Sequence, residues 1–386
     1  MGRQPLPQGF STIWTTVAID LVGFGIVLPI LPLYAEDFGA SPAVVGLLVA
    51  SFSLAQLAFA PLLGALSDRI GRKPVLLVSL VGTAVGSLLT GLAGSLWVLF
   101  AGRLVDGASG ASVSVAQAAV TDLAPPDQRP RLLGLLGAAF GLGFVAGPSL
   151  GALAALGGRE LPFFVAAGLA AVNFVVALVR LPETAGPAPE ALPEREIGRD
   201  PVVRRLILVV FVSMVAFSGF EATFALLGER RLDLDLSSTA GVFAVIGVVL
   251  VVVQSTAVGP VHRRLGESGA LRAALCLDAA GLVLLAFDGG WPLMACALGL
   301  LLLGHGLLTP TLTAAVASRV HARSRGVTLG VQQSAGGLAR VVGPVMAGFL
   351  FGHVGIPAPY AVGAVLLLLA VWALPRTRLS APQEAT

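Results

Sequence analysis

Apolar runs of about twenty residues recur along the whole chain, and proline, glycine or charged residues separate each run from the next. A helix needs about 20 apolar residues to cross a bilayer. Membrane barrel strands are shorter and alternate between apolar and polar positions. These runs do not alternate, so the pattern predicts twelve membrane-spanning helices. The expected ranges are 10–34, 43–65, 75–94, 96–120, 132–156, 161–181, 204–228, 238–260, 269–287, 291–317, 326–352 and 357–375.

The composition agrees with a chain embedded in a lipid bilayer. Hydrophobic types make up 56% of the 386 residues and charged types 12%, whereas an ordinary soluble domain carries about 25% charged residues. The mean hydropathy is +0.91. These values exclude a soluble enzyme, and a net charge of +3 is too small for a nucleic-acid-binding surface. We therefore expect an all-α integral membrane protein, a monomer, that binds no nucleic acid.

The positions of the basic residues predict the orientation. If the N-terminus is cytoplasmic, 19 of the 24 lysine and arginine residues lie in cytoplasmic segments. Three of them, Arg159, Arg230 and Arg231, lie in outer loops. Because cytoplasmic loops carry the excess of Lys and Arg, we expect a multi-pass protein of the cell (inner) membrane with both termini in the cytoplasm. The polar segment Met1–Gln8 is too short for a cleavable signal, so the first run is expected to remain as a membrane helix.

The two halves of the chain resemble each other. Gly147-Pro148 recurs as Gly343-Pro344, 196 residues later, and Arg69-Ile70-Gly71 recurs as Arg264-Leu265-Gly266, 195 residues later. The segment between the halves, LPETAGPAPEALPEREIGRD, is rich in proline and charge and cannot form a packed core. We therefore expect two pseudo-symmetric six-helix bundles joined by a cytoplasmic linker. The boundaries are 1–181 for the first bundle, 182–203 for the linker and 204–386 for the second bundle with a short tail.

The loop after the second expected span reads GALSDRIGRKP, from Gly64 to Pro74. This run resembles the cytoplasmic signature of the major facilitator superfamily, G-x-L-(S/A)-D-R-x-G-R-(K/R)-x, and its alternative reading is an ordinary basic turn. The resemblance implies two six-helix bundles around a central cavity and a loop that latches the halves together on the cytoplasmic side. The counterpart, Gly259 to Gly266, is degenerate, with Arg263 where Asp68 would be. The implied latch residues are Gly64, Asp68, Arg69, Gly71, Arg72 and Lys73.

The fifth expected span contains glycine at every fourth position. Gly143, Gly147 and Gly151 form a flat stripe that another helix can approach closely, and Pro148 removes one backbone hydrogen bond. The run resembles the antiporter motif of drug/proton exporters in this superfamily, G-x-x-x-G-P-x-x-G-G, with Ala152 in place of the last glycine. The alternative is packing of small residues without a role in transport.

Ionisable residues occur inside the first and fourth expected spans. Asp20 lies about 15 Å along its span, where a charge costs about 3 kcal/mol. It is either a proton carrier or a structural hydrogen-bonding group. Its surroundings, D-x-x-G-x-G-x-x-x-P-x-x-P, resemble the first span of the tetracycline/proton antiporters and related multidrug exporters. Arg103 and Asp106 share one helix face. Arg103 resembles the span-4 arginine that the superfamily links to proton coupling, and a structural ion pair is the alternative.

Three further ionisable residues lie in expected spans of the second half. Glu221 stands among Phe217, Phe220 and Phe224, where it either holds a proton, faces a lipophilic cation or lines an outer vestibule. Asp278 resembles the span-9 acid of the tetracycline exporters, although the third span lacks the acid that those exporters have there. Arg340 can offset one of these two acids. The proton-coupling candidates are therefore Asp20, Arg103, Asp106, Glu221, Asp278 and Arg340.

Polar residues inside the spans are candidates for a cavity lining, or for hydrogen bonds between helices. His305 is either accessible and titratable near neutral pH or buried and neutral. The candidates, together with the three phenylalanines above, are Gln56, Gln117, Gln254, His305, Gln332 and Gln333. The sequence has no metal-ligand spacing and no nucleotide-binding motif, so we expect no metal and no cofactor.

Because the sequence has no nucleotide-binding motif, we expect an ion gradient to be the energy source for transport. The sequence predicts that the chain exports a lipophilic small molecule in exchange for protons, by alternating access. One alternative is a proton-coupled symporter or facilitator for a sugar or other metabolite. A second alternative is a membrane sensor or scaffold that transports nothing. The antiporter motif and the few polar residues in the spans favour the exporter.

Overall fold

The computed structural model describes residues 6–125, 128–184, 200–320 and 325–374, and every regular element in those ranges is an α-helix. The prediction of an all-helical chain is therefore confirmed. The helices are α1 (Phe10–Val27), α2 (Leu31–Glu36), α3 (Pro42–Ile70), α4 (Arg72–Gly91), α5 (Leu96–Ala108), α6 (Ser112–Leu123), α7 (Arg129–Ala155), α8 (Leu161–Arg180), α9 (Pro201–Leu232), α10 (Leu236–Thr256), α11 (Val258–Ala286), α12 (Gly290–Ser318), α13 (Arg325–His353) and α14 (Ala358–Ala373).

Within the described residues, ten helices are long and apolar enough to cross a membrane. The two other predicted spans are helical as well. The fourth is divided into α5 and α6, and the last is the 16-residue α14. The first span continues past α1 as the short α2, because Pro29 and Pro32 lack the N–H that an unbroken helix requires. All twelve predicted apolar runs thus coincide with helices.

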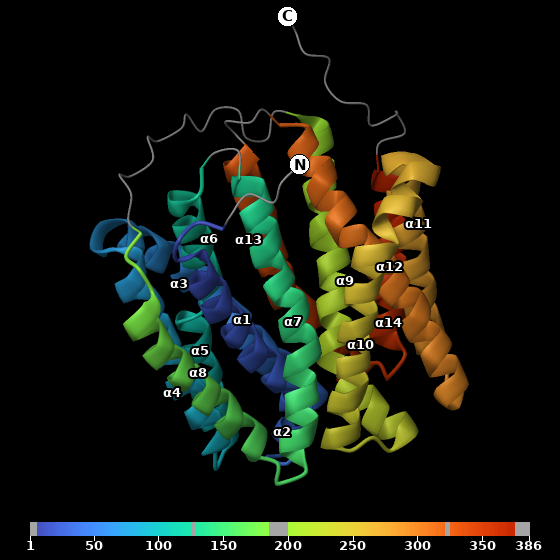
Figure 1. Cartoon of the computed structure of the whole chain (residues 1–386). Coiled ribbons are helices and arrows are strands. Elements are labelled where there is room, and N and C mark those ends of the chain that lie inside the picture. The colour runs from blue at the N-terminus through green and yellow to red at the C-terminus, as the bar shows by residue number, and fades with distance from the viewer. Residues whose placement is uncertain (1–5, 126–127, 185–199, 321–324, 375–386) are drawn as a thin grey trace, which may run out of the picture. The chain divides into compact units, whose positions relative to one another are not determined.

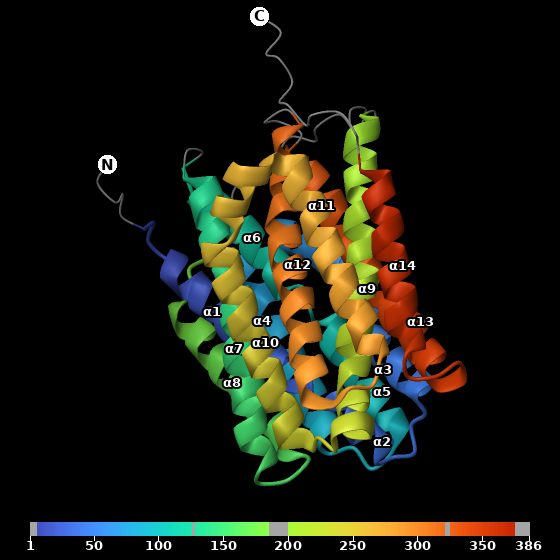
Figure 2. The ribbon, with the colours of Figure 1, turned by 90° about the vertical axis from the view of Figure 1, so that its right-hand side faces the viewer.

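The chain divides into two compact units. Unit 1 contains Met1–Ala40, Ser51–Pro189 and Leu234–Gly247, and unit 2 contains Ser41–Ala50, Glu190–Asp233 and Val248–Thr386. In unit 1, α1 packs on α7 and α8, and α4 packs on α5 and α8 (Figure 1). In unit 2, α9 packs on α13 and α14, and α11 packs on α12 and α14 (Figure 2). The same pattern of helix contacts therefore occurs once in each unit, as a duplicated sequence requires.

The internal repeat extends to backbone conformation. Gly71, between α3 and α4, has φ +105°, and Gly266, 195 residues later, has φ +67°. Both values fall where residues with a Cβ are strained. In unit 2 the non-helical Gly266 lies inside α11, so the residues before it correspond to the end of α3. Glycine at these two positions allows the turn that connects successive antiparallel helices.

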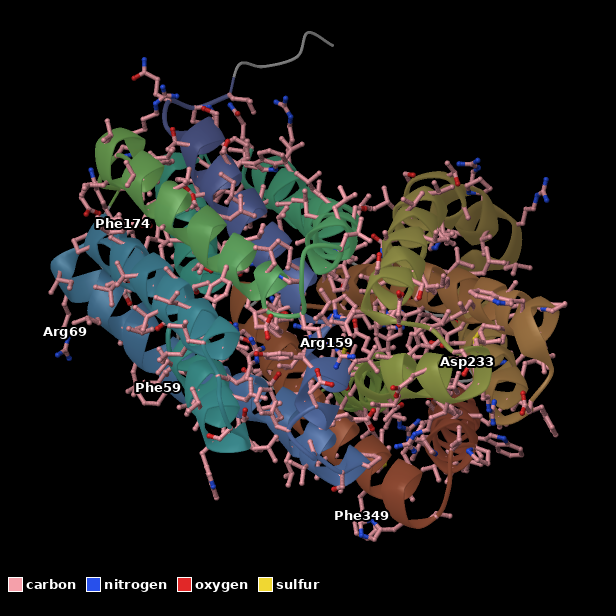
Figure 3. The ribbon with its side chains drawn as sticks, turned by 90° about the horizontal axis from the view of Figure 1, so that it is seen from below. Phe59, Arg69, Arg159, Phe174, Asp233 and Phe349 are labelled. Atoms are coloured by element: carbon pink, nitrogen blue, oxygen red, sulfur yellow. The ribbon has the colours of Figure 1, made fainter. Side chains whose placement is uncertain are left out.

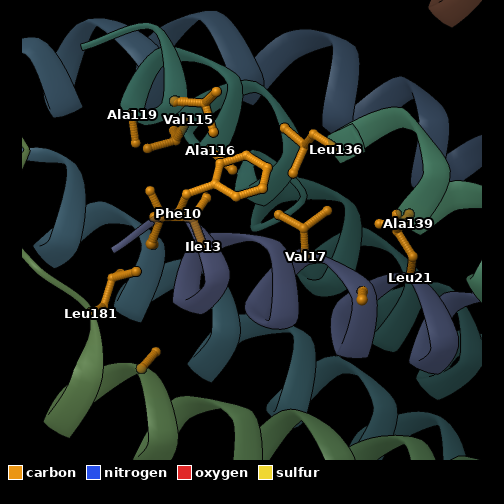
Figure 4. Close-up of a cluster of buried hydrophobic side chains, with 14 of the residues drawn as sticks. Phe10, Ile13, Val17, Leu21, Val115, Ala116, Ala119, Leu136, Ala139 and Leu181 are labelled. Atoms are coloured by element: carbon orange, nitrogen blue, oxygen red, sulfur yellow. The ribbon is translucent and has the colours of Figure 1, made fainter. Parts of the chain in front are cut away.

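The hydrophobic core of unit 1 brings together side chains of α1, α6 and α7. Phe10, Ile13 and Val17 of α1 pack against Val115 of α6 and Leu136 of α7 (Figure 4). Each of these side chains is at most 3% exposed. Residues more than 100 positions apart thus share one apolar cluster.

Many large apolar side chains lie on the outer surface. Phe59 and Phe349 point away from their helices (Figure 3) and are 46% and 54% exposed. Trp97 and Trp372, near helix ends, are 83% and 79% exposed. So much apolar surface is unfavourable in water and suits lipid, with tryptophan near helix ends as in interfacial aromatic belts.

Residues 185–199 of the expected linker and 375–386 of the expected tail lie outside the described residues.

Candidate functional site

A break in the fourth predicted span forms the centre of a polar cluster in unit 1. Helix α5 ends at Ala108 and α6 begins at Ser112. The carbonyl oxygen of Gly110, between them, accepts a hydrogen bond from Nε2 of Gln56 at 2.7 Å. A Cβ on Gly110 would lie 2.8 Å from that same nitrogen. Gly110 therefore lets the interrupted backbone and the α3 side chain meet, and non-helical backbone at membrane depth requires such a partner.

The three ionisable residues predicted for the first and fourth spans lie together at this break. Oγ of Ser112, the first residue of α6, donates a hydrogen bond to Oδ2 of Asp20 at 2.5 Å. Nη1 of Arg103 donates to Oδ2 of Asp106 at 2.9 Å, and both residues are buried. The Arg103 guanidinium also lies over the ring of Phe52, 4.4 Å from the centroid, an arrangement that favours the cation.

The ionisable residues of the unit 1 cluster influence one another electrostatically. Asp106 is close enough to Asp20 to repel it electrostatically, and Thr83 hydrogen-bonds Asp106. A change of charge on Asp20 would therefore affect the Arg103–Asp106 pair. Ser112, Phe52 and Thr83 were not among the residues predicted from the sequence, because their roles depend on contacts between helices.

The glycine stripe of α7 packs on α1, next to Asp20. A Cβ on Gly143 would lie 2.7 Å from Cβ of Leu21, and one on Gly147 would lie 2.6 Å from Cα of Gly25. A Cβ on Gly25 would in turn lie 2.4 Å from the carbonyl oxygen of Gly143. Helices α1 and α7 are therefore in backbone contact. In unit 2, Gly343 of α13 packs equally closely on α9.

A second polar cluster lies in unit 2. Asp278 of α11 and His305 of α12 face each other, with 3.5 Å between Oδ2 and Nδ1. The ring of Phe217, on α9, stacks on the His305 ring at a centroid distance of 3.6 Å and an interplanar angle of 8°. His305 is thus buried, as one of the two alternatives for it assumed, and an acid and an aromatic ring are its neighbours.

Glu221 and Arg340 belong to the same region of unit 2. Glu221, on α9, lies in electrostatic range of Arg340 on α13 and of His305. The phenylalanines named with Glu221 form a ladder, with centroid distances of 5.8 Å from Phe217 to Phe220 and 5.1 Å from Phe220 to Phe224. The three rings are buried, so they pack inside unit 2 and do not line an open cavity in this structure.

The glutamines predicted to line a cavity differ in their surroundings. Gln254 and Gln333 are exposed, whereas Gln56, Gln117 and Gln332 are partly buried. Nε2 of Gln332 donates to Oγ1 of Thr313 at 3.0 Å and so joins α13 to α12. Among the described residues, no group of three His, Cys, Asp or Glu side chains is placed to hold a metal ion.

The loop motif between α3 and α4 forms an ion-pair network in unit 1. Arg72 lies 2.5 Å from Oδ1 of Asp68 and 3.0 Å from Oδ2 of Asp122, at the end of α6. The carboxylate of Glu183, just after α8, accepts hydrogen bonds from the backbone N–H groups of Arg72 at 2.8 Å and Lys73 at 3.3 Å. It thereby caps the N-terminus of α4, where negative charge is stabilising.

Two more motif residues have distinct places. A Cβ on Gly71 would lie 2.4 Å from Oε2 of Glu183, so a side chain there would displace the capping carboxylate, and the positive φ of Gly71 favours glycine as well. Arg69, in the last turn of α3, is exposed, and a Cβ on Gly64 would meet no atom within 4 Å.

Unit 2 contains an ion pair of reversed polarity at the corresponding place. Glu267, which follows Gly266 as Arg72 follows Gly71, lies 3.0 Å from Nη1 of Arg319 at the end of α12. The Arg72–Asp122 distance in unit 1 is also 3.0 Å. The two motif sequences do not reveal this pair, because Arg263 stands where Asp68 would be and the charges of the two partners are exchanged between the halves.

Exchange of the two charges in unit 2 tests whether this pair is a structural clamp. Glu267→Arg alone and Arg319→Glu alone should each destabilise the purified protein, because each places like charges together. The double exchange should recover stability, with a coupling energy of roughly 0.5–3 kcal/mol. Thermal unfolding in detergent measures this. Arg264→Glu, at an exposed position, is the control and should change the stability little. If the double exchange loses as much stability as the two single exchanges added together, the two residues do not act as a pair.

Comparisons with known proteins agree with these features. The family model described as Major Facilitator Superfamily matches residues 13–341 and, in a second match, 258–385. The class E tetracycline resistance protein of Escherichia coli is 34% identical over 352 residues, covering 87% of this chain and 86% of that protein. The class C protein of Escherichia coli is 33% identical over 377 residues, covering 94% and 95%.

A solved structure is similar over nearly the whole chain. The human organic anion transporter MFSD10 (TETRAN) has a TM-score of 0.73 and 28% sequence identity, and the match covers 95% of this chain and 99% of that chain. The repeated helix packing, the loop motif and these matches lead to one conclusion: the chain belongs to the major facilitator superfamily of membrane transporters.

Proposed function

We propose that this protein exports lipophilic small molecules in exchange for protons. The observation that carries the proposal is that each unit holds a cluster of ionisable side chains inside membrane-spanning helices. Asp20, Arg103 and Asp106 form one cluster, and Asp278 and His305 form the other. Ionisable groups are costly inside a bilayer and are typical of proton relays in transporters.

The substrate class rests on the relatives. Phe217, Phe220 and Phe224, which were expected to line a cavity, are 6%, 2% and 0% exposed and pack inside unit 2. Two relatives about one-third identical to this chain are named tetracycline resistance proteins. Small amphipathic drugs are therefore the proposed substrates, and antibiotic resistance is the proposed consequence of their export.

In the proposed cycle, protons enter from outside onto one or more of Asp20, Glu221 and Asp278. Substrate and proton must stabilise different conformations, because a ligand that binds both conformations equally shifts neither. Both termini lie in the cytoplasm, and the latch motif holds the cytoplasmic ends together in one of the two states. The competing symporter would instead move substrate and proton in the same direction.

Proton release from everted membrane vesicles tests the proposal. Respiration acidifies the lumen, and a panel of dyes, lipophilic cations and tetracycline is then added. We expect at least one compound to release protons through the unaltered protein and not through Asp20→Asn. The control is Asp37→Asn, which alters an acid paired with the exposed Arg159 and should behave as the unaltered protein does.

Two outcomes contradict this account. If the folded protein releases protons with no compound of the panel, the export of lipophilic drugs is wrong. If Asp20→Asn releases protons at the unaltered rate, Asp20 does not carry the coupled proton.

A further inference from the structure

A buried acid and a buried histidine in unit 2 have unused hydrogen-bonding capacity that points to a shared proton. Asp278 is 2% exposed and His305 is 7% exposed. Within the described residues, Oδ2 of Asp278 and Nδ1 of His305 have no hydrogen-bond partner, yet these two atoms are 3.5 Å apart. Buried polar atoms are costly when unpaired. A proton between the two atoms satisfies both.

Close packing of α11 on α12 fixes this pair. A Cβ on Gly304 would lie 2.3 Å from the backbone nitrogen of Asp278. A Cβ on Gly281 would lie 2.5 Å from the backbone nitrogen of Leu301. The two backbones are therefore in close contact at the pair and one turn away from it.

Phe217 connects the pair to a third helix. The centroid of its ring lies 3.6 Å from that of the His305 imidazole, and the two rings are nearly parallel. The other imidazole nitrogen, Nε2, lies 3.4 Å from Oγ1 of Thr309, which belongs to α12 itself. An aromatic face attracts a cation more strongly than a neutral ring. Addition of a proton to His305 therefore changes the force between α12 and α9 directly.

Other ionisable groups face this region from the neighbouring helices. From α9 comes Glu221 and from α13 comes Arg340, and these two have opposite charges within electrostatic range of each other. From α14 comes Tyr360, whose hydroxyl lies beside Thr223. Helix α10 has no ionisable side chain. The opposite charges of Glu221 and Arg340 compensate each other, so the exchangeable proton is best assigned to Asp278 and His305.

We propose that Asp278 and His305 together bind one exchangeable proton and that Phe217, a positioning residue, transmits its presence to α9. The inference rests on the proposed proton-coupled transport and names the proton-binding group in unit 2. With the proton, the imidazolium and the carboxylate form a neutral ion pair. When the proton leaves Nδ1, the pair has one net negative charge and the stacked ring becomes neutral.

Transport measurements on single and double variants test the shared site. In everted vesicles, Asp278→Asn and His305→Gln should each lower substrate-driven proton release at least tenfold. The double variant should be no slower than the slower single one, because residues that act as a unit are not additive. His353→Gln is the matched control, since His353 also stacks on a phenylalanine, Phe349, but is exposed. Independent losses that multiply in the double variant would overturn the shared site.

A measurement without transport separates this inference from the proposed function. In protein with ¹⁵N-labelled histidine, the ring signals that disappear in His305→Gln belong to His305. We expect their response to pH to change in Asp278→Asn and to stay unchanged in His353→Gln. An identical response with and without the Asp278 carboxylate overturns the shared proton, even if drug-driven proton release is observed. A response that does depend on Asp278 supports the site even if no drug releases protons.

The role of Phe217 has its own readout. Phe217→Leu should keep the Asp278-dependent response of the His305 signals but lower coupled proton release, and Phe217→Tyr should restore the release. If Phe217→Leu releases protons as fast as the unaltered protein, the stacked ring does not transmit the protonation state.

Discussion

Replacing Arg103 with methionine should destabilise the protein by about 3–5 kcal/mol, the range observed when one partner of a buried ion pair is removed. Asp106 would then be left buried without the guanidinium that now lies 2.9 Å away. Thermal unfolding of the purified protein in detergent measures the loss. The control is Arg159→Met, because Arg159 pairs with Asp37 on the surface with 57% of its side chain exposed. Such exposed pairs contribute at most about 1 kcal/mol.

The double variant Arg103→Met/Asp106→Leu separates the two roles left open for this pair. Apolar residues of similar volume often replace a buried ion pair without loss of stability, so the double variant should be nearly as stable as the unaltered protein. If the pair takes part in proton coupling, the stable double variant should release no protons in response to substrate. Full release by that variant would show that the pair is structural only.

Replacing Gly147 with valine should separate α7 from α1. The new Cβ would lie 2.6 Å from Cα of Gly25 and 2.7 Å from the carbonyl oxygen of Val22, and both are backbone atoms that cannot turn aside. Overpacking of this kind typically costs about 1–3 kcal/mol and sometimes more. The melting temperature and the yield of folded protein should both fall.

Gly134→Val is the matched control for this substitution. Gly134 lies in the same helix, and a Cβ there would meet no atom within 4 Å. Equal stability of the two valine variants would contradict the close contact of α1 and α7 and, with it, the position of Asp20 beside that contact.

The sequence predicted those features that depend on local pattern. The length of each apolar run fixed the helices, because a helix is the simplest way to satisfy backbone polar groups in lipid. The repeat that relates Gly71 to Gly266 was visible in the sequence, and both residues have positive φ. The resemblance to the superfamily at the loop motif and at Gly147-Pro148 agrees with the family match. An acid inside an apolar run, such as Asp20 or Asp278, is recognisable from the sequence alone because its neighbours are apolar.

Features that depend on pairing between helices were not predictable in the same way. The apolar run 96–120 predicts one continuous span across the break between α5 and α6, because Ser109-Gly110-Ala111 interrupts neither the apolar character nor the length of the run. The partner of Asp20, Ser112, is 92 residues away, and that of Glu267, Arg319, is 52 residues away. The stack of Phe217 on His305 similarly requires knowledge of how α9 and α12 pack.

The direction of proton movement tests the central claim most directly. The purified protein is reconstituted into liposomes that contain a pH-sensitive dye, and both sides start at the same pH. A compound that released protons from the vesicles is then added outside, so that its own gradient is the only driving force. The proposed exchange predicts that the interior becomes alkaline as the compound enters and protons leave. Acidification of the interior, or entry of the compound with no change of pH, would contradict drug/proton antiport.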